Sequence, residues 1–133
     1  MCGIAGIITQ TQGADILLRI KNAAATLHHR GPESNGAWQN EKRTTAFAHQ
    51  RLSIIDLSSC GAQPMHYAGR YTIVHNGEVY NYKEIRKTLE SKGHQFTSAT
   101  DTEVIVAAYA EYGNDCLQQF DGMNTRMLML HRS

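Results

Sequence analysis

The segment most informative about the fold lies at the start of the chain and has the sequence Met1-Cys2-Gly3-Ile4-Ala5-Gly6-Ile7-Ile8. Residues 3–8 predict a β-strand, and the two glycines inside it indicate close approach of another backbone or of a ligand. A cysteine stands directly before this strand. If Met1 is removed, Cys2 carries a free α-amine beside its own thiol. Because the proton affinities of an amine and a thiol are similar, the amine can take the thiol proton and activate the sulfur as a nucleophile.

The three cysteines predict neither a disulfide framework nor a structural metal site. Cys2, Cys60 and Cys116 lie far apart, without a C-x-x-C pair, and H-x-x-x-H spacing is absent among the seven histidines. We therefore expect no bound metal, and we expect Cys60 and Cys116 to be ordinary small apolar residues. The alternative for Cys2 is the same: a small side chain at the start of a buried strand.

Composition predicts one globular domain. The chain has 133 residues, of which 41 % are hydrophobic and 19 % charged, with a formal net charge of +1. No basic cluster predicts nucleic-acid binding, and no apolar run reaches the ~18 residues of a membrane span. With no secretory signal pattern at its start, we expect the protein to be cytoplasmic.

Hydrophobic periodicity predicts strands and helices in blocks. Helices are expected at residues 14–29, 82–92 and 102–112, the last capped by Thr100 or Asp101. Strands are expected at residues 3–8, 37–39, 44–55, 70–75 and 95–97. An ordered loop is expected at residues 30–36. Because the blocks do not alternate strictly, the pattern predicts an α+β fold in which sheets are layered with helices.

Six short segments carry a family resemblance. They are residues 1–7 (MCGIAGI), 29–33 (HRGPE), 48–56 (AHQRLSIID), 61–65 (GAQPM), 75–82 (HNGEVYNY) and 100–104 (TDTEV). In this order they resemble the segments of class-II glutamine amidotransferases, whose mature chains begin at a nucleophilic cysteine. The RLSIID and GAQPM segments point to the asparagine synthetase branch of that family.

The resemblance implies a fold and an activity. The fold would be a layered sandwich of antiparallel sheets flanked by helices, of the N-terminal nucleophile hydrolase type, with the glutaminase domain at residues 2–123. The activity would be hydrolysis of the glutamine side-chain amide to glutamate and ammonia through a Cys2 thioester. The ammonia would pass to an asparagine-synthetase-type domain absent here. ATP and Mg²⁺ are implied only for that domain, so no cofactor is expected in this chain; the resemblance also admits a homodimer.

The resemblance also assigns residues to an oxyanion hole. The Asn76 side chain and the Gly77 backbone N–H would stabilise the tetrahedral oxyanion, for which such donors typically contribute ~10²–10³ in rate. The competing interpretation of this pair is structural, because Asn-Gly is also a strong β-turn dipeptide. One interpretation does not exclude the other.

Free glutamine carries a carboxylate and an ammonium that a selective site must pair. Arg51 suits the carboxylate through its bidentate fork, whereas Asp101, with Glu78 near the same end, suits the ammonium. Spacing alone favours Asp101 as a helix N-cap, Glu78 as a solvated charge and Arg51 as an edge-facing strand residue. The remaining substrate-binding residues implied by the resemblance are Leu52, Ile54 and Ile55. His29 and Arg30 are expected to order their loop.

The last ten residues, 124–133, depart from the family pattern after Asp121-Gly122-Met123. We expect this tail to leave the sheets short of strands, with exposed edges, and the chain to be a poor catalyst in isolation. Two rival functions therefore stay open. One is a catalytically silent remnant that binds glutamine or a partner chain; the other, disfavoured by residue spacing, is a cysteine/histidine metal-binding module.

Overall fold

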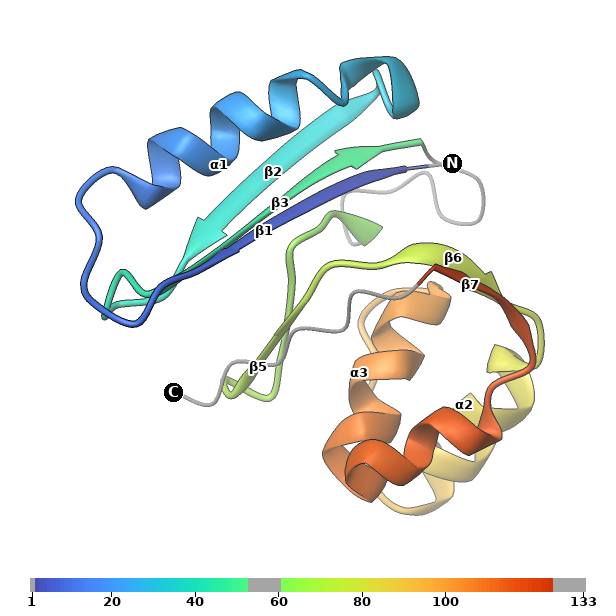
Figure 1. The fold of residues 1–133 in the computed structure, drawn as a ribbon. Coiled ribbons are helices and arrows are strands. Elements are labelled where there is room, and N and C mark those ends of the chain that lie inside the picture. Colours follow the sequence, from blue (N-terminus) through green and yellow to red (C-terminus); the bar gives the residue numbers. More distant parts are fainter. Residues whose placement is uncertain (1, 53–60, 126–133) are drawn as a thin grey trace.

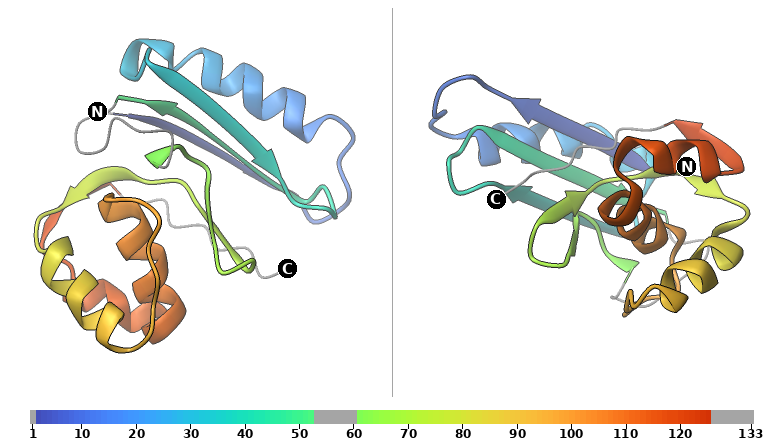
Figure 2. Two further views of the ribbon diagram at one scale, coloured as in Figure 1. Left: turned by 180° about the vertical axis from the view of Figure 1, so that it is seen from behind. Right: turned by 90° about the horizontal axis from the view of Figure 1, so that it is seen from below.

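The computed structural model describes residues 2–52 and 61–125, and these form four layers (Figure 1). Helix α1 (Ile16–Ala25) covers the outer face of a first sheet, and a second layer of strands lies against the other face. Helices α2 (Tyr82–Ser91) and α3 (Asp101–Tyr112) cover the far side of that second layer, as both views in Figure 2 also show. The expected α+β class, with antiparallel sheets between helices, is confirmed.

The first sheet has the order β1-β3-β2 and is antiparallel throughout. Its strands are β1 (Gly3–Ile8), β2 (Ser34–Gln39) and β3 (Thr45–Arg51). Ala46 and Ala48 of β3 pack against the apolar side of α1. Because side chains alternate along a strand, His49 and Arg51 point to the opposite face, into the space between the two strand layers.

The second strand layer consists of two antiparallel pairs. They are β4 (Met65–Tyr67) with β5 (Tyr71–Ile73), and β6 (Asn76–Val79) with β7 (Gly122–Thr125). The register of the second pair places Asn76 opposite Thr125 and Val79 opposite Gly122. The strand β6 is therefore held by residues that follow it by more than forty positions. Two 3-10 helices complete the described elements: η1 (His28–Arg30) and η3 (Gly113–Gln119).

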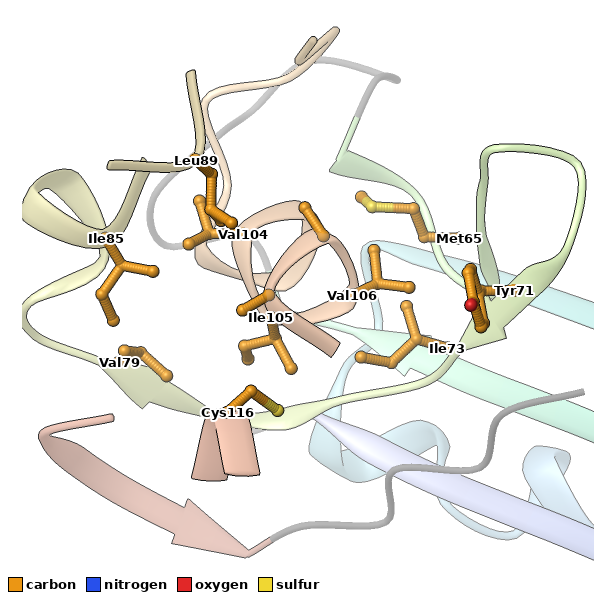
Figure 3. Close-up of a cluster of buried hydrophobic side chains, with 12 residues drawn as sticks. Met65, Tyr71, Ile73, Val79, Ile85, Leu89, Val104, Ile105, Val106 and Cys116 are labelled. Atoms are coloured by element: carbon orange, nitrogen blue, oxygen red, sulfur yellow. The ribbon is translucent and has the colours of Figure 1, made fainter. Parts of the chain in front are cut away.

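The larger apolar core lies between the second strand layer and its two helices (Figure 3). Helix α3 is buried on all sides from Asp101 to Ala108, because strands cover one side of it and α2 and η3 pack on others. Such a helix shows no one-sided apolar stripe. The buried members of this cluster are Met65, Tyr71, Ile73, Val79, Ile85, Leu89, Val104, Ile105, Val106, Ala107, Ala108 and Cys116.

Helices were predicted more accurately than strands. The predictions for α2 and α3 each differ from the structure by one residue at one end, and Gly93 and Gly113 follow them with positive φ, as helix-ending glycines do. Helix α1 is shorter than the predicted 14–29, and residues 28–30 form η1 instead. Cys116 is a buried apolar residue, as expected.

Four parts of the strand prediction differ from the structure. Residues 34–36, predicted as loop, begin β2, and residues 65–67, for which no strand was predicted, form β4. Residues 76–79, predicted to end a strand in an Asn-Gly turn, form β6, whereas 95–97 contain no strand. Strand β6 pairs with residues more than forty positions away, β2 and β4 each pair with the strand that follows, and the Thr97 N–H donates to the Glu103 side chain. Each outcome depends on a pairing partner, which single-strand propensity does not report. Of the predicted strand 44–55, residues 45–51 are confirmed, and 53–55 lie outside the described residues.

No helix within residues 2–52 and 61–125 is long and apolar enough to cross a membrane.

Candidate functional site

Strand β1, which directly follows Cys2, begins at the end of the first sheet where β6 and β7 run in the second layer (Figures 1 and 2). The Leu52 backbone N–H donates to Cys2 Sγ at 3.3 Å, and the thiol lies 3.5 Å from the Leu52 carbonyl oxygen. The Arg30 side chain donates from Nε to the Cys2 carbonyl oxygen at 3.4 Å. The contacts with Leu52 fix the position of the sulfur. Both contacts come from segments far away in sequence, so the tertiary fold positions this thiol.

Arg51 reaches from the first sheet across to the second layer. An ideal Cβ on Gly61 would lie 2.7 Å from Arg51 Nη2 and 3.0 Å from the Thr100 methyl group. The guanidinium therefore lies over the bare Cα of Gly61, beside the residue that precedes α3. Arg51 is half-buried and belongs to the central strand of its sheet, which contradicts the edge-facing interpretation.

Asp101 is the first residue of α3, and its carboxylate is buried. The N-cap is Thr100, whose hydroxyl accepts from the Glu103 N–H, so the interpretation of Asp101 as the cap is wrong. Asp101 Oδ2 instead accepts from the Val79 N–H at 2.9 Å. This bond attaches the end of β6 to the start of α3.

The predicted oxyanion-hole residues lie together on β6. Asn76 is buried, whereas Gly77 and Glu78 are exposed, so an incoming ligand can reach the backbone at Gly77. The exposure of Glu78 agrees equally with a solvated charge. Upstream of β6, the His75 N–H donates to Gln63 Oε1, and Gln63 Nε2 donates to the Thr102 hydroxyl, so Gln63 joins β6 to α3 as well.

The remaining predicted substrate-binding residues divide into two groups. Leu52 contacts Cys2 through its backbone rather than its side chain. Ile54 and Ile55 lie outside the described residues, as does Cys60. The structure thus brings Arg51 to the N-terminus of α3 and Asp101 to β6, and places Cys2 beside Leu52.

His49 is a buried neutral base on the inner face of β3. Burial lowers its pKa to about 4, interaction with the His75 backbone offsets part of the shift, and the positive charge of Arg51 adds to it. His49 is therefore uncharged at neutral pH, which leaves Arg51 as the cation on this face of β3.

Sequence reasoning missed two groups that shape the site. Gly61 leaves space for the Arg51 guanidinium, and no local sequence pattern indicates this contact. Glu103 accepts four hydrogen bonds from Thr97 and Ser98. A signal for it exists, because Thr100-Asp101-Thr102-Glu103 has the T-x-x-E spacing of a capping box.

The site as a whole suits a zwitterionic amino acid attacked by a thiol. It offers a nucleophile, a cation, a buried carboxylate and backbone donors, but among residues 2–52 and 61–125 no group of three His, Cys, Asp or Glu side chains could hold a metal ion.

Comparisons of sequence and structure relate this chain to known proteins. Residues 1–131 match the family described as "Glutamine amidotransferase domain". Asparagine synthetase [glutamine-hydrolyzing] 1 of Bacillus subtilis is 40 % identical over 127 residues, covering 92 % of this chain and 20 % of the relative. Asparagine synthetase [glutamine-hydrolyzing] 1 of Arabidopsis thaliana is 37 % identical over 131 residues, covering 97 % of this chain and 22 % of the relative.

A solved structure shares the fold. It is glutamine phosphoribosylpyrophosphate (PRPP) amidotransferase from B. subtilis complexed with ADP and GMP, with a TM-score of 0.69 at 22 % identity, covering 91 % of this chain and 33 % of the other. The layered fold that the resemblance implied is thus shared with an amidotransferase of known structure.

The chain belongs to the glutamine amidotransferase domain family. Its curated relatives are asparagine synthetases, and it spans about one-fifth of their length.

Proposed function

We propose that this chain hydrolyses the side-chain amide of glutamine to glutamate and ammonia through a thioester on Cys2. The observation that carries the proposal is the contact between Cys2 Sγ and the Leu52 backbone N–H, at 3.3 Å. Leu52 directly follows Arg51, the last residue of β3. The family match and the glutamine-hydrolysing relatives support the choice of glutamine as substrate.

Substrate binding would use the two charges of free glutamine. Arg51, over Gly61, would pair the α-carboxylate, and Asp101 would pair the α-ammonium with the oxygen that does not accept from Val79. A bidentate guanidinium–carboxylate pair fixes orientation as well as position. Glu78, exposed on β6, would add negative charge at the ammonium end.

The chemical step begins after removal of Met1. The Cys2 thiol gives its proton to the new α-amine, directly or through one water, and the thiolate attacks the amide carbon of glutamine. The carbonyl electron pair moves to oxygen, where the Asn76 side chain and the Gly77 N–H donate to it. The carbon–nitrogen bond then breaks, and the α-ammonium returns its proton to the leaving nitrogen, so ammonia departs. Water attacks the thioester, releasing glutamate and restoring the thiol.

The fate of the ammonia belongs to the same proposal. The relatives are asparagine synthetases of which this chain spans about one-fifth, so an acceptor of that type outside this chain would consume the ammonia. ATP and Mg²⁺ would act only in that acceptor, and no cofactor is assigned to residues 2–123, which we propose as the glutaminase unit.

The test compares the parent chain with Cys2→Ala after intact-mass measurement has established that Met1 is absent from the parent. We expect the parent to release glutamate and ammonia in equal amounts. Cys2→Ala should release neither, yet bind glutamine in calorimetry with an affinity within about twofold of the parent, because Arg51 and Asp101 are unchanged. Cys60→Ala, which removes a different thiol, should keep the parent rate.

Two outcomes contradict the proposal. Hydrolysis by Cys2→Ala at the parent rate would remove Cys2 as nucleophile. Glutamine binding by the processed parent without any turnover would instead favour the silent, binding-only alternative.

A further inference from the structure

We propose that Glu103 is a positioning residue of the glutamine site: by fixing the turn at residues 97–100, it sets where Asp101 and the Thr100 methyl group lie against β6 and Arg51. The inference rests on the function proposed above and extends it to a residue that does not touch the substrate.

The carboxylate of Glu103 is almost fully buried, with 4 % of the residue exposed, and each of its oxygens accepts two hydrogen bonds. Oε1 accepts from the Thr97 N–H at 2.9 Å and the Thr97 hydroxyl at 3.1 Å. Oε2 accepts from the Ser98 N–H and the Ser98 hydroxyl, both at 2.7 Å. Burial acts to raise the pKa of Glu103, but these donors outweigh it and the pKa is lowered. An ionised carboxylate therefore organises the turn.

Hydrogen bonds connect the turn at residues 97–100 to the start of α3. Ser98 Oγ lies 2.9 Å from the Thr100 hydroxyl and accepts from the Thr100 N–H at 3.3 Å. The Thr100 hydroxyl in turn accepts from the Glu103 N–H, closing a loop of contacts around the N-cap. Every rotation of the turn would thus move Thr100 and the residue that follows it.

Asp101, the residue after Thr100, connects this hydrogen-bond network to the proposed glutamine site. Its Oδ2 accepts from the Val79 N–H, so it holds the strand that carries Asn76 and Gly77. The Thr100 methyl group, meanwhile, lies beside the Arg51 guanidinium at Gly61. One buried carboxylate thereby controls the spacing between the predicted partners of the two charged ends of glutamine.

The variant Glu103→Gln tests this with little change of shape. A carboxamide has one acceptor oxygen, and its NH₂ group cannot accept. Whichever position the nitrogen takes, it faces a backbone N–H, of Thr97 or of Ser98, and repels it. The turn must therefore shift, whereas a hydroxyl facing the nitrogen could simply rotate. The matched control is Glu111→Gln on the same helix, whose carboxylate forms surface contacts with Lys92 and His94.

The readout is alkylation of Cys2 in the processed full chain, followed by peptide mass mapping. One probe is 6-diazo-5-oxo-L-norleucine, a glutamine analogue with an electrophilic diazoketone in place of the amide; the other is iodoacetamide, which lacks the amino-acid end. We expect Glu103→Gln to raise the diazoketone concentration for half-maximal labelling roughly tenfold, the effect of losing one hydrogen bond to a charged group. The iodoacetamide rate should stay within twofold of the parent. Glu111→Gln should change neither.

A second variant guards against misfolding of the first. Ser98→Ala keeps both backbone donors to Glu103 but removes the hydroxyl that links Glu103 to Thr100. We expect it to raise the diazoketone concentration for half-maximal labelling roughly threefold and to leave the iodoacetamide rate unchanged. If the parent is not labelled by the diazoketone, or if glutamine does not protect it, the proposed function itself fails. If the parent is labelled and both variants keep its half-maximal concentration, or lose reactivity to both probes equally, Glu103 has no positioning role.

Discussion

Gly61→Ala should weaken glutamine binding while leaving the fold almost as stable as before. The added Cβ would lie 2.7 Å from Arg51 Nη2, and ordinary contact begins near 3.4 Å, so the guanidinium must move by about 0.7 Å. That displacement exceeds the ~0.5 Å within which binding groups must be held. Nη2 is the far end of a flexible side chain, which can move without disturbing the backbone. The Thr100 methyl group, 3.0 Å from the added Cβ, must also shift by a few tenths of an ångström.

The magnitude follows from what Arg51 would lose. A charge-assisted hydrogen bond contributes about 1.5–3 kcal/mol, equivalent to roughly ten- to 150-fold in Kd. Arg51→Ala removes the guanidinium and should reach this range in full. Gly61→Ala keeps it but moves it, so we expect about a tenfold loss of affinity. The change in unfolding free energy should stay below about 1 kcal/mol, because alanine also lowers the entropy of the unfolded chain.

The assay is calorimetry with glutamine in a Cys2→Ala background, which prevents turnover, together with urea unfolding. Gly69→Ala, in the turn between β4 and β5, is the reciprocal control. Gly69 has a φ of +64° and no atom within 4 Å of the position of a Cβ. Alanine there should cost about 1–2 kcal/mol of stability, from left-handed backbone strain, and leave glutamine affinity unchanged.

The reasoning fails if Gly61→Ala binds glutamine as tightly as its background while Arg51→Ala does not, because the guanidinium would then tolerate displacement. It also fails if Gly61→Ala and Gly69→Ala lose affinity and stability in the same proportion.

Two further predictions concern stability. The pKa of His49 is lowered from 6.5 to about 4, chiefly by burial, so the stability it contributes is complete above pH 6.5 and is lost as pH falls from 6.5 toward 4. The parent should therefore lose about 2 kcal/mol more unfolding free energy between pH 7 and pH 5 than His49→Leu does. If urea titrations give the same pH 7 to pH 5 difference for both proteins, His49 is not buried in its uncharged form. Gly36→Ala would place a Cβ against the Gln63 carbonyl oxygen between the strand layers, and it should cost roughly 1–3 kcal/mol; a parent-like urea midpoint would show that the layers are not in close contact there.

Elements with a strong local signal were predictable from the sequence. Helix α2 buries Ile85 and Leu89 on one side and is followed by Gly93, so periodicity and a helix-ending glycine located it together. The same reasoning could not identify β6, because Asn76-Gly77 has turn chemistry and its strand conformation depends on β7. Residues 95–97 were wrongly predicted as a strand, because the Thr97 N–H donates to the Glu103 carboxylate instead of to another strand.

The sequence named the candidate site residues, whereas their contacts had to come from the structure. The resemblance proposed Cys2 and Arg51, and in the structure Cys2 Sγ contacts the backbone of Leu52, the residue that follows Arg51. The resemblance gave no reason for Asp101 to accept a backbone hydrogen bond from Val79, which requires α3 and β6 to pack closely. Contacts of this kind follow from the packing of layers, which local sequence patterns do not contain.

The pairing of β1 with β3 also bears on how the chain matures during synthesis. Gly3 pairs with Gln50, and Cys2 Sγ meets the backbone of a residue fifty positions later. The proposed function requires removal of Met1, and until that part of the chain has left the ribosome the N-terminal strand has no partner and would be accessible to a peptidase. Once β3 has paired, the residues that follow Met1 are fixed in a sheet, so under the proposed function processing would be easiest on the nascent chain.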